Sequence, residues 1–325
     1  MGFPGRLAEA PPGMSGSYQL VQLPNGSWSV RSLEAAETFH PVVGPVAEAE
    51  ALYVRQLRVR QRLADAHEAR EALVVWDVGL GAAANTLTLL QSVRDLPGRI
   101  RILSFDHTLE PLRFAVRNSA RLGYFGGHEP EVETLLAASR AVFRSGALTV
   151  DWSLHTGDFP TALASAEAES WPSPHAILFD AYSPARNPVM WTLPLFSRLR
   201  ELSPDSRPCA LATYTRATLV RVTLLRAGWR VGIGNATGEK DETTVAANHS
   251  SLIERPLGPA WWARALRSTS AEPLRDAIYC QQPMSESTRT ALEGLPPFRA
   301  AASDPGAGPR SQMPARRIEA HKSAP

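Results

Sequence analysis

Four aspartates with the right type and spacing for ligand chemistry follow short apolar runs: Asp77, Asp106, Asp158 and Asp180. The first opens the stretch DVGLGAAAN, in which Gly79 and Gly81 let the backbone approach a ligand closely. An acid about 25 residues after such glycines is the usual partner of ribose hydroxyls, and Asp106 stands there. Asp158 is then placed for an adenine amino group. Any one of these acids alone would be an ordinary cap or turn residue, but four in succession predict a ligand with a ribose and an adenine.

Two nucleotide classes fit this pattern poorly. The chain lacks the G-x-x-x-x-G-K-[ST] loop that cradles ATP phosphates. Ala83 stands where a dinucleotide fingerprint has its third glycine. S-adenosylmethionine therefore suits the acids better than ATP or NAD.

The elements that must position these acids alternate between apolar runs and helical patterns, which predicts an α/β fold. Continuous apolar runs indicate strands covered on both faces. Only about eight residues join the last two strands, too few for a crossover helix. We therefore expect a Rossmann-like, mostly parallel, doubly wound sheet of seven strands with an antiparallel last strand, the fold of S-adenosylmethionine-dependent methyltransferases. The expected strands cover residues 73–79, 100–106, 147–158, 175–181, 209–215, 229–234 and 243–251.

Composition divides the chain into four parts. Residues 1–17 and those after about 300 are rich in Pro, Gly, Ala and Ser, which predicts disorder. Between them we expect an N-terminal segment with a helix over 18–72, a methyltransferase domain over 73–270, and a C-terminal extension over 271–325. The helix carries several arginines, which form either a solvated face or a strip that faces RNA.

The cellular compartment is predicted from three features that the sequence lacks: a disulfide framework, a membrane span and a signal peptide. The two cysteines, Cys209 and Cys280, cannot supply a disulfide framework or a metal cluster. No apolar run approaches the ~18 residues of a membrane span, and the N-terminus lacks the apolar core of a signal peptide. We expect a cytoplasmic protein with no metal and no membrane contact. The net charge of +2 neither requires nor excludes RNA.

The loop after the fourth expected strand, in LFDAYSPARNPVMW, is stiffened by two prolines and carries an acid, an amide and two aromatic rings. Asp180 is a candidate acceptor of a hydrogen bond from an amine. Tyr182 and Trp191 are candidate platforms for a base, although Trp191 is equally placed to be core. Asn187 either reads a base edge or caps the next helix. Pro184 reduces the cost of ordering the loop.

Several stretches resemble the methyltransferase domain of the bacterial tRNA-modifying enzyme MnmC and its stand-alone relatives. They are DVGLGAAAN, TGDFPTAL, FDAYSPARNPVMW and LATYTRATLVRVTLLRAGWRV, with an upstream Glu-x-(Tyr)-His and Gly-x-x-x-Glu pattern. The similarity spans about residues 20–270, and SPARNPVMW is its most specific part. Departures include Ala181 and Ala83 where glycine is usual, Phe39 for a tyrosine, and Asp241, which interrupts a Lys-Arg-Glu.

The resemblance implies methyl transfer from S-adenosyl-L-methionine to 5-aminomethyl-(2-thio)uridine at the tRNA wobble position, giving the 5-methylaminomethyl product. Asp180 would be the catalytic residue. The cofactor would be bound by Asp77, Gly79, Gly81, Asn85, Asp106 and Asp158. The substrate would be bound by Tyr182, Pro184, Asn187, Trp191 and Tyr214. Too few residues remain for an FAD-dependent oxidase domain, so a separate protein would supply the aminomethyl precursor.

Three other functions remain open. A paralogue would methylate another amine or a hydroxyl, which the departures at Ala181 and Asp241 allow. An aminopropyltransferase of the spermidine-synthase type shares the sheet and the acid after strand four, but NPVMW is unlike it. A catalytically dead binding protein would not be expected to keep all four acids.

Overall fold

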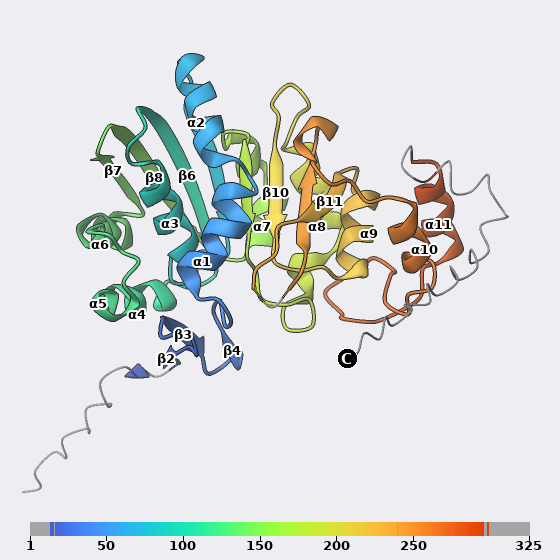
Figure 1. Cartoon of the computed structure of the whole chain (residues 1–325), viewed down its shortest axis with the longest axis horizontal. Helices are drawn as coiled ribbons and strands as arrows, with labels where there is room; N and C mark the ends of the chain where they lie inside the picture. The colour runs from blue at the N-terminus through green and yellow to red at the C-terminus, as the bar shows by residue number, and fades with distance from the viewer. Residues whose placement is uncertain (1–13, 16, 239, 296–297, 299–325) are drawn as a thin grey trace, which may run out of the picture.

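The computed structural model describes residues 14–15, 17–238, 240–295 and 298, and its centre is one eight-stranded sheet (Figure 1). Its strands β10, β9, β5, β6 and β8 are parallel, whereas β12 is antiparallel to β10 and β11, and β7 is antiparallel to β8. The order across the sheet is β11 (Arg230–Gly234), β12 (Thr243–Ala247), β10 (Ala210–Thr213), β9 (Ala176–Phe179), β5 (Leu73–Val78), β6 (Gly98–Asp106), β8 (Leu148–Thr156) and β7 (Arg140–Ser145). The Rossmann-like fold with an antiparallel last strand is confirmed.

Helices cover both faces of the sheet, as the continuous apolar strands predicted. Side chains that alternate along each strand enter two separate cores: Val75 packs with α1–α6, and Trp76 packs with α7–α10. The helices are α1 (Pro45–Ala49), η1 (Glu50–Arg55), α2 (Val59–Glu68), α3 (Ala84–Val93), α4 (Glu110–Arg117), α5 (Ser119–Leu122), α6 (Glu129–Ala138), α7 (Phe159–Ala164), η2 (Ala166–Ser170), η3 (Pro188–Trp191), α8 (Leu193–Glu201), α9 (Thr218–Arg226), η4 (Ser250–Leu252), α10 (Pro259–Ala265) and α11 (Glu286–Glu293).

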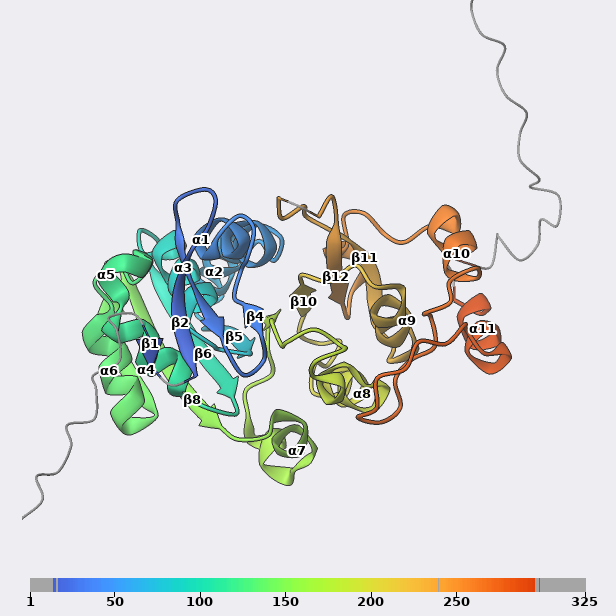
Figure 2. The same ribbon diagram turned by 90° about the horizontal axis from the view of Figure 1, so that it is seen from below.

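A small antiparallel sheet precedes the large one and lies beyond its carboxyl edge (Figures 1 and 2). Its strands are β1 (Met14–Ser15), β2 (Tyr18–Gln22), β3 (Trp28–Ser32) and β4 (Glu37–Thr38). Tyr18 packs its ring 6.2 Å from that of Phe114 on α4, and this contact helps to attach the small sheet to the domain. The predicted disordered segment 1–17 overlaps β1, and its residues 1–13 and 16 lie outside the described residues.

Two elements differ from the expectation. The first is the added strand β7, which forms a hairpin with β8 at Gly146, where φ is +62°. The second is the N-terminal helix, which is broken into α1, the π-helix η1 and α2. Arg58 adopts a left-handed conformation at the break and pairs with Glu254 at 2.5 Å. Arg60 pairs with Asp95 at 2.8 Å, so these two arginines contact the protein itself.

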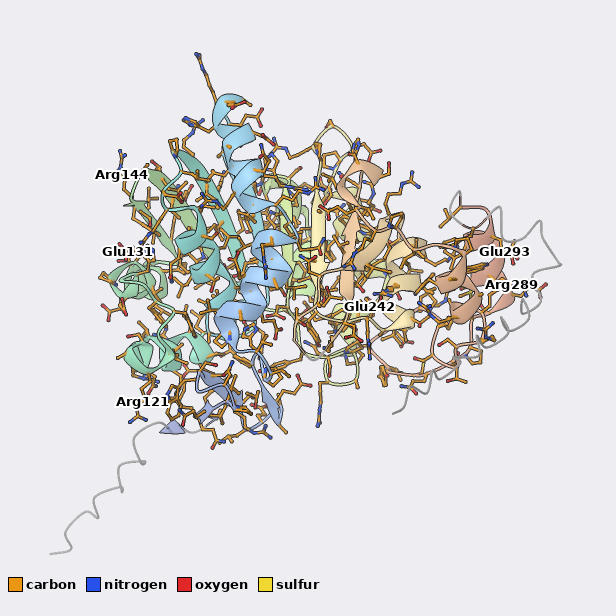
Figure 3. All side chains as sticks on the ribbon, in the orientation of Figure 1. Arg121, Glu131, Arg144, Glu242, Arg289 and Glu293 are labelled. Atoms are coloured by element: carbon orange, nitrogen blue, oxygen red, sulfur yellow. The ribbon has the colours of Figure 1, made fainter. Side chains whose placement is uncertain are left out.

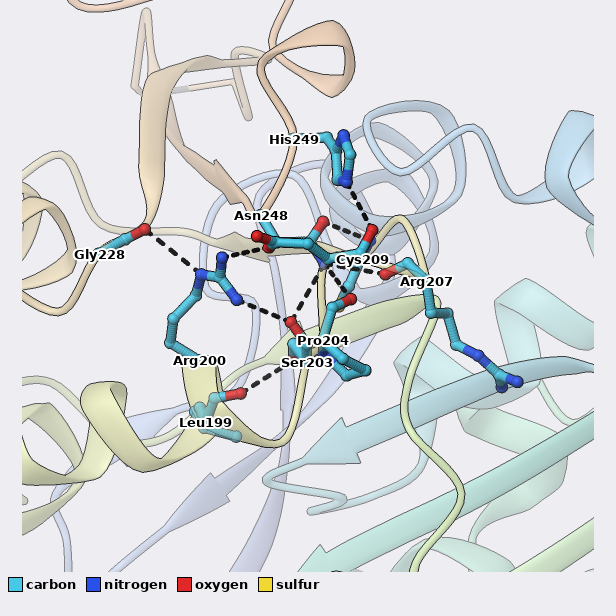
Figure 4. Close-up of polar contacts among 10 residues, drawn as sticks. Leu199, Arg200, Ser203, Pro204, Arg207, Cys209, Gly228, Asn248 and His249 are labelled. Carbon is cyan, nitrogen blue, oxygen red and sulfur yellow. Dashed lines mark hydrogen bonds and ion pairs between the residues drawn. The ribbon is translucent and has the colours of Figure 1, made fainter. Parts of the chain in front are cut away.

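Asn248, directly after β12, holds this edge of the sheet to the loop between α8 and β10 (Figure 4). Its Nδ2 donates to the carbonyl oxygens of Ser203, Pro204 and Arg207, and its Oδ1 accepts from the backbone N–H of Cys209 at 2.8 Å. These bonds satisfy a buried amide and fix the antiparallel strand beside β10.

The C-terminal extension packs against the domain as far as Phe298, whose ring stacks 4.9 Å from that of Trp262 on α10. Charged side chains such as Arg289 and Glu293, paired at 2.7 Å on α11, lie at the periphery (Figure 3). The tail predicted to be disordered, from Arg299 onward, lies outside the described residues. Among the described helices, none combines the length and apolarity needed to cross a membrane.

Candidate active site

A cavity of about 750 Å³ opens at the carboxyl ends of the parallel strands, beneath the small N-terminal sheet. Ligands of open α/β sheets bind at this edge. Of the predicted site residues, nine line the cavity and three do not. The lining residues are Gly79, Gly81, Asn85, Asp106, Asp158, Asp180, Tyr182, Asn187 and Tyr214.

The glycine-rich turn brings backbone close to Asp180. Gly79 has φ +93°, and a Cβ there would lie 2.6 Å from the carbonyl oxygen of Asp180. Gly81 has φ +52°, and the ring of Phe39 from the small sheet lies over it. Glycine is therefore required at Gly79 both by conformation and by space. The helix α3 begins directly afterwards with no side-chain cap, so the N–H groups of its first turn are available to a ligand.

Asp77 does not line the cavity, which corrects its prediction as a cofactor ligand. It lies within β5, and its side chain points under α3, where Oδ2 accepts from Thr86 Oγ1 at 2.7 Å and from Ser104 Oγ at 2.9 Å. Burial raises the pKa of Asp77 to about 7 although these two hydrogen bonds lower it. Its role is to join the start of α3 to β5 and β6.

Asp106 and Asp158 lie at the ends of β6 and β8 as predicted. Asp106 Oδ2 accepts from the backbone N–H of Gly81 at 2.8 Å, which fixes the glycine-rich turn. Asp158 caps α7, accepting from the Thr161 N–H at 3.0 Å. The hydrogen bonds that Asp158 accepts within the described part of the chain involve Oδ2, so Oδ1 is left for a ligand.

Asp180 follows β9 and projects into the cavity with a nearly buried carboxylate. Its Oδ2 accepts from Asn85 Nδ2 at 2.7 Å. Burial raises the pKa of Asp180, whereas the charge of His40 and the hydrogen bond from Asn85 lower it. Asn85 therefore reaches the catalytic candidate, and its own Oδ1 is buried without a partner among the described residues.

Two residues that the sequence reasoning missed complete this group. His40 Nε2 lies 3.9 Å from Asp180 Oδ2, and His40 Nδ1 lies 3.5 Å from Glu48 Oε1. Both residues line the cavity. A signal was present, because His40 ends the Glu-x-(Tyr)-His pattern and Glu48 ends the Gly-x-x-x-Glu pattern.

Trp191 lies in the core beneath the loop after β9, and it does not face the cavity. Trp191 is fully buried, packs 5.2 Å from the ring of Phe179, and donates from Nε1 to the Tyr182 carbonyl at 2.8 Å. Its burial leaves the indole closed to a base, which corrects its prediction as a platform. Pro184 likewise lies outside the cavity lining, which corrects its prediction as a substrate contact.

Tyr182, Asn187 and Tyr214 remain on the substrate side. Burial raises the pKa of Tyr182 to about 12, so it stays a neutral phenol. Asn187 makes no side-chain cap for η3, and this leaves its amide toward the cavity. Tyr214 donates to the Ala181 carbonyl at 3.1 Å, and Lys240 Nζ lies 4.6 Å from the centre of its ring.

These residues fit S-adenosylmethionine. Asp106 stands at the end of the second parallel strand, where a carboxylate meets ribose hydroxyls. Gly79 and Gly81 line the cavity, and their missing Cβ atoms let Asp180 and Phe39 close around it, while the uncapped start of α3 suits the carboxylate of the ligand. The methyl group would then lie toward Asp180, on the side of the cavity that Tyr182 and Asn187 line.

Comparisons with known proteins agree. Residues 132–249 match a family described as S-adenosyl-L-methionine-dependent methyltransferase. The bifunctional protein MnmC of tRNA 5-methylaminomethyl-2-thiouridine biosynthesis is 28% identical over 233 residues in Aeromonas hydrophila and 30% identical over 234 residues in Stutzerimonas stutzeri. These alignments cover 67% and 69% of this chain and 34% of each relative, so the chain spans about a third of their length.

The solved structure of MNMC2 from Aquifex aeolicus shares the fold, with a TM-score of 0.61 and 23% identity over 87% of this chain and 85% of that one. The chain therefore contains an MnmC-like methyltransferase domain whose cofactor is S-adenosyl-L-methionine.

Proposed function

We propose that this chain methylates the primary amine of 5-aminomethyl-(2-thio)uridine at the wobble position of tRNA, acting in the cytoplasm. The observation that carries the proposal is the position of Asp180. Its nearly buried carboxylate lies beside the glycine-rich turn, at the head of the SPARNPVMW loop. The curated relatives that match this chain are named for 5-methylaminomethyl-2-thiouridine biosynthesis in tRNA.

When bound, S-adenosylmethionine supplies a methyl group activated by its sulfonium. The chain contributes position and exclusion of water. Asp180 accepts a hydrogen bond from the amine, orients its lone pair, and stabilises the charge that forms on nitrogen. Asn85 holds Oδ2 of this carboxylate from the side of α3, and the carboxylate lines the cavity that the amine would enter.

The base would be held by the residues around the cavity mouth. Tyr182 offers a ring from the loop, with Phe39 6.0 Å away between ring centres. Asn187 offers an amide for a base edge. A uridine would have to leave its stack to enter this site, as bases do in enzymes that act on them.

A direct test is methylation of tRNA from cells that lack this gene, followed by nucleoside mass spectrometry. We expect the 5-methylaminomethyl nucleoside to form with S-adenosylmethionine. Product only with another amine or a hydroxyl compound would favour the paralogue, which the departures at Ala181 and Asp241 allow. Transfer only from decarboxylated S-adenosylmethionine would indicate an aminopropyltransferase.

Single-turnover rates of Asp180 variants test the role of the carboxylate. Asp180→Ala and Asp180→Asn should both lower the rate by roughly 100-fold, because neither can balance the charge on the amine. The matched control is Asp276→Asn, at an exposed carboxylate on the C-terminal extension. A fully active Asp180→Asn enzyme with unchanged melting temperature would remove Asp180 from the mechanism.

A further inference from the structure

His40 is buried between two carboxylates that come from different parts of the chain. It follows β4 of the small sheet, Glu48 lies on α1, and Asp180 follows β9. The side chain of His40 is 8% exposed, with Nδ1 3.5 Å from Glu48 and Nε2 3.9 Å from Asp180. The backbone of His40 has φ +49°, a conformation that non-glycine residues rarely adopt. The surrounding contacts hold this conformation, as is frequent for residues at functional sites.

The charges around His40 favour its imidazolium form. Burial lowers the pKa of His40, but Glu48 and Asp180 outweigh burial and the pKa is raised. Tyr53 on η1 faces the same group with a neutral hydroxyl, because burial raises its pKa well above the ordinary value. Asp77 is enclosed under α3, where burial and, to a smaller extent, the charge of Asp180 raise its pKa. The other charged or titratable residues that line the cavity are Glu34, Glu37, Asp106, His107, Asp158, Arg186 and Lys240.

Without a cation, the ionised form of Asp180 would be disfavoured, since burial and the negative charge of Glu48 both raise the pKa of Asp180. The imidazolium of His40 opposes both effects. Asn85 then fixes Oδ2 of Asp180 from the side of α3, and His40 faces the same oxygen from the side of the small sheet. Both Asn85 and His40 approach Asp180 at Oδ2, and Tyr53, which lies outside the cavity lining, also helps to lower the pKa of this carboxylate.

We propose that His40 is a positioning residue that acts through Asp180: held by Glu48, it keeps the Asp180 carboxylate ionised and fixed in place beside the acceptor amine. The identity of that amine rests on the proposed function. The arrangement itself does not, because it would serve any acceptor that carries a proton-bearing nitrogen. The small N-terminal sheet thereby contributes to the reaction and does more than cover the cofactor.

The first test is the pH profile of the single-turnover methylation rate for His40→Asn. Asparagine tolerates a left-handed backbone and carries no charge at any pH. The acid limb of the profile should move to higher pH, because His40 lowers the pKa of Asp180 and its loss removes that effect. The loss of rate should be roughly tenfold at the acid end of the profile and should disappear toward its alkaline end, since the variant keeps the carboxylate. His67→Asn, at an exposed histidine on α2, should keep the original profile. An equal loss for His40→Asn at every pH would overturn the proposal.

The second test does not depend on the acceptor. Labelled-histidine NMR of the unliganded protein should show a His40 resonance, assigned by its loss in His40→Asn, whose pKa falls in Asp180→Asn and in Glu48→Gln. An unchanged His40 titration in both variants would overturn the proposal, even in an enzyme that methylates tRNA. If instead the titration responds but no tRNA is methylated, the proposed function fails and the pairing stands. If His40→Asn does not fold, the histidine titration in Glu48→Gln still tests the pairing, because Glu48 raises the pKa of His40.

Discussion

Asn85 Nδ2 donates a 2.7 Å hydrogen bond to Asp180 Oδ2, and this bond joins the helix after the glycine-rich turn to the end of β9. One residue thus belongs to the element that would hold the cofactor, and the other to the loop that would hold the acceptor. The bond holds the carboxylate where it lines the cavity that the acceptor would enter. The two substrates of a methyl transfer must meet within a fraction of an ångström, and a direct link of this kind supports that alignment.

Asn85→Asp should therefore impair the enzyme in a pH-dependent way. It places a second carboxylate at hydrogen-bond distance from Asp180, and the pair will share a proton. The folded-state pKa of the pair is then raised, so the free energy of unfolding should fall as pH rises from about 4 toward the raised value. We expect at least a tenfold lower methylation rate at about pH 7, where the shared proton blocks the acceptor oxygen. Asn85→Ala, which removes the bond without adding charge, should give a loss that varies little with pH. A pH dependence of Asn85→Asp equal to that of Asn85→Ala would contradict this account.

Gly79→Ala should destabilise the protein by more than the cost of placing alanine at a positive φ. The new Cβ would lie 2.6 Å from the Asp180 carbonyl oxygen, and backbone on both sides leaves little room to move. The chain offers a matched control in Gly127, which has φ +89° and no atom within 4 Å of the place that a Cβ would take. Both alanines carry the conformational cost of about 1 kcal/mol, and Gly79→Ala should exceed it by about 2 kcal/mol in urea unfolding. Equal destabilisation of the two variants would show that the close approach has no energetic weight.

Asp106→Asn should weaken cofactor binding. The carboxylate accepts from Gly81 N–H at 2.8 Å and from Thr108 N–H at 3.2 Å, so it both shapes the turn and presents charge to ribose hydroxyls. Hydrogen bonds to a charged group contribute about 1.5–3 kcal/mol, equivalent to roughly 10- to 100-fold in affinity. Calorimetry with S-adenosylhomocysteine measures the change. Asp151→Asn, on β8 outside the cavity lining, should leave the affinity unaltered. Tight binding by Asp106→Asn would remove Asp106 from the cofactor site.

The ends of β6 and β9 could be predicted from the sequence because each apolar run stops at an acid, whereas β8 continues past Asp151 and its end is marked by the turn TGD. This rule, with the turn after β8, placed Asp106, Asp158 and Asp180 at the edge where the cavity lies. It failed for Asp77, which precedes the last residue of β5. Successive side chains of a strand point to opposite faces of the sheet, so Asp77 points to the same face as Val75, two residues earlier. Val75 packs on the face that α3 covers.

The partnership of His40 with Asp180 could not be predicted because 140 positions separate them in the sequence and no local pattern couples the small sheet to β9. The break in the N-terminal helix at Arg58 could not be predicted either, because the residues before and after it have the composition of one continuous helix. Trp191 illustrates a third limit. The sequence left Trp191 equally placed as core or as a platform for a base, and the structure decides for core, where its indole N–H donates to the Tyr182 carbonyl.

Asp77 yields the last prediction, which concerns stability rather than catalysis. Its pKa is raised from 3.8 to about 7, first by burial, while Thr86 and Ser104 lower it through hydrogen bonds. The folded protein thus binds a proton that the unfolded chain releases above about pH 4. The contribution of Asp77 to the free energy of unfolding is fully present below about pH 4 and is lost as pH rises toward 7.

Asp77→Asn should remove this dependence, because an amide keeps an acceptor oxygen for Thr86 and Ser104 but does not ionise. Its free energy of unfolding, relative to that of the unchanged protein, should rise by on the order of 1 kcal/mol per pH unit between about pH 5 and pH 7, and then level off. Urea unfolding at several pH values across and above this range measures the slope, with Asp276→Asn as the exposed control. Affinity for S-adenosylhomocysteine should change by less than about threefold, since Asp77 lies outside the cavity lining and would lose no contact with the ligand. A flat difference in stability across this range would mean that Asp77 is ionised in the folded protein throughout, with its charge held by Thr86 and Ser104 alone.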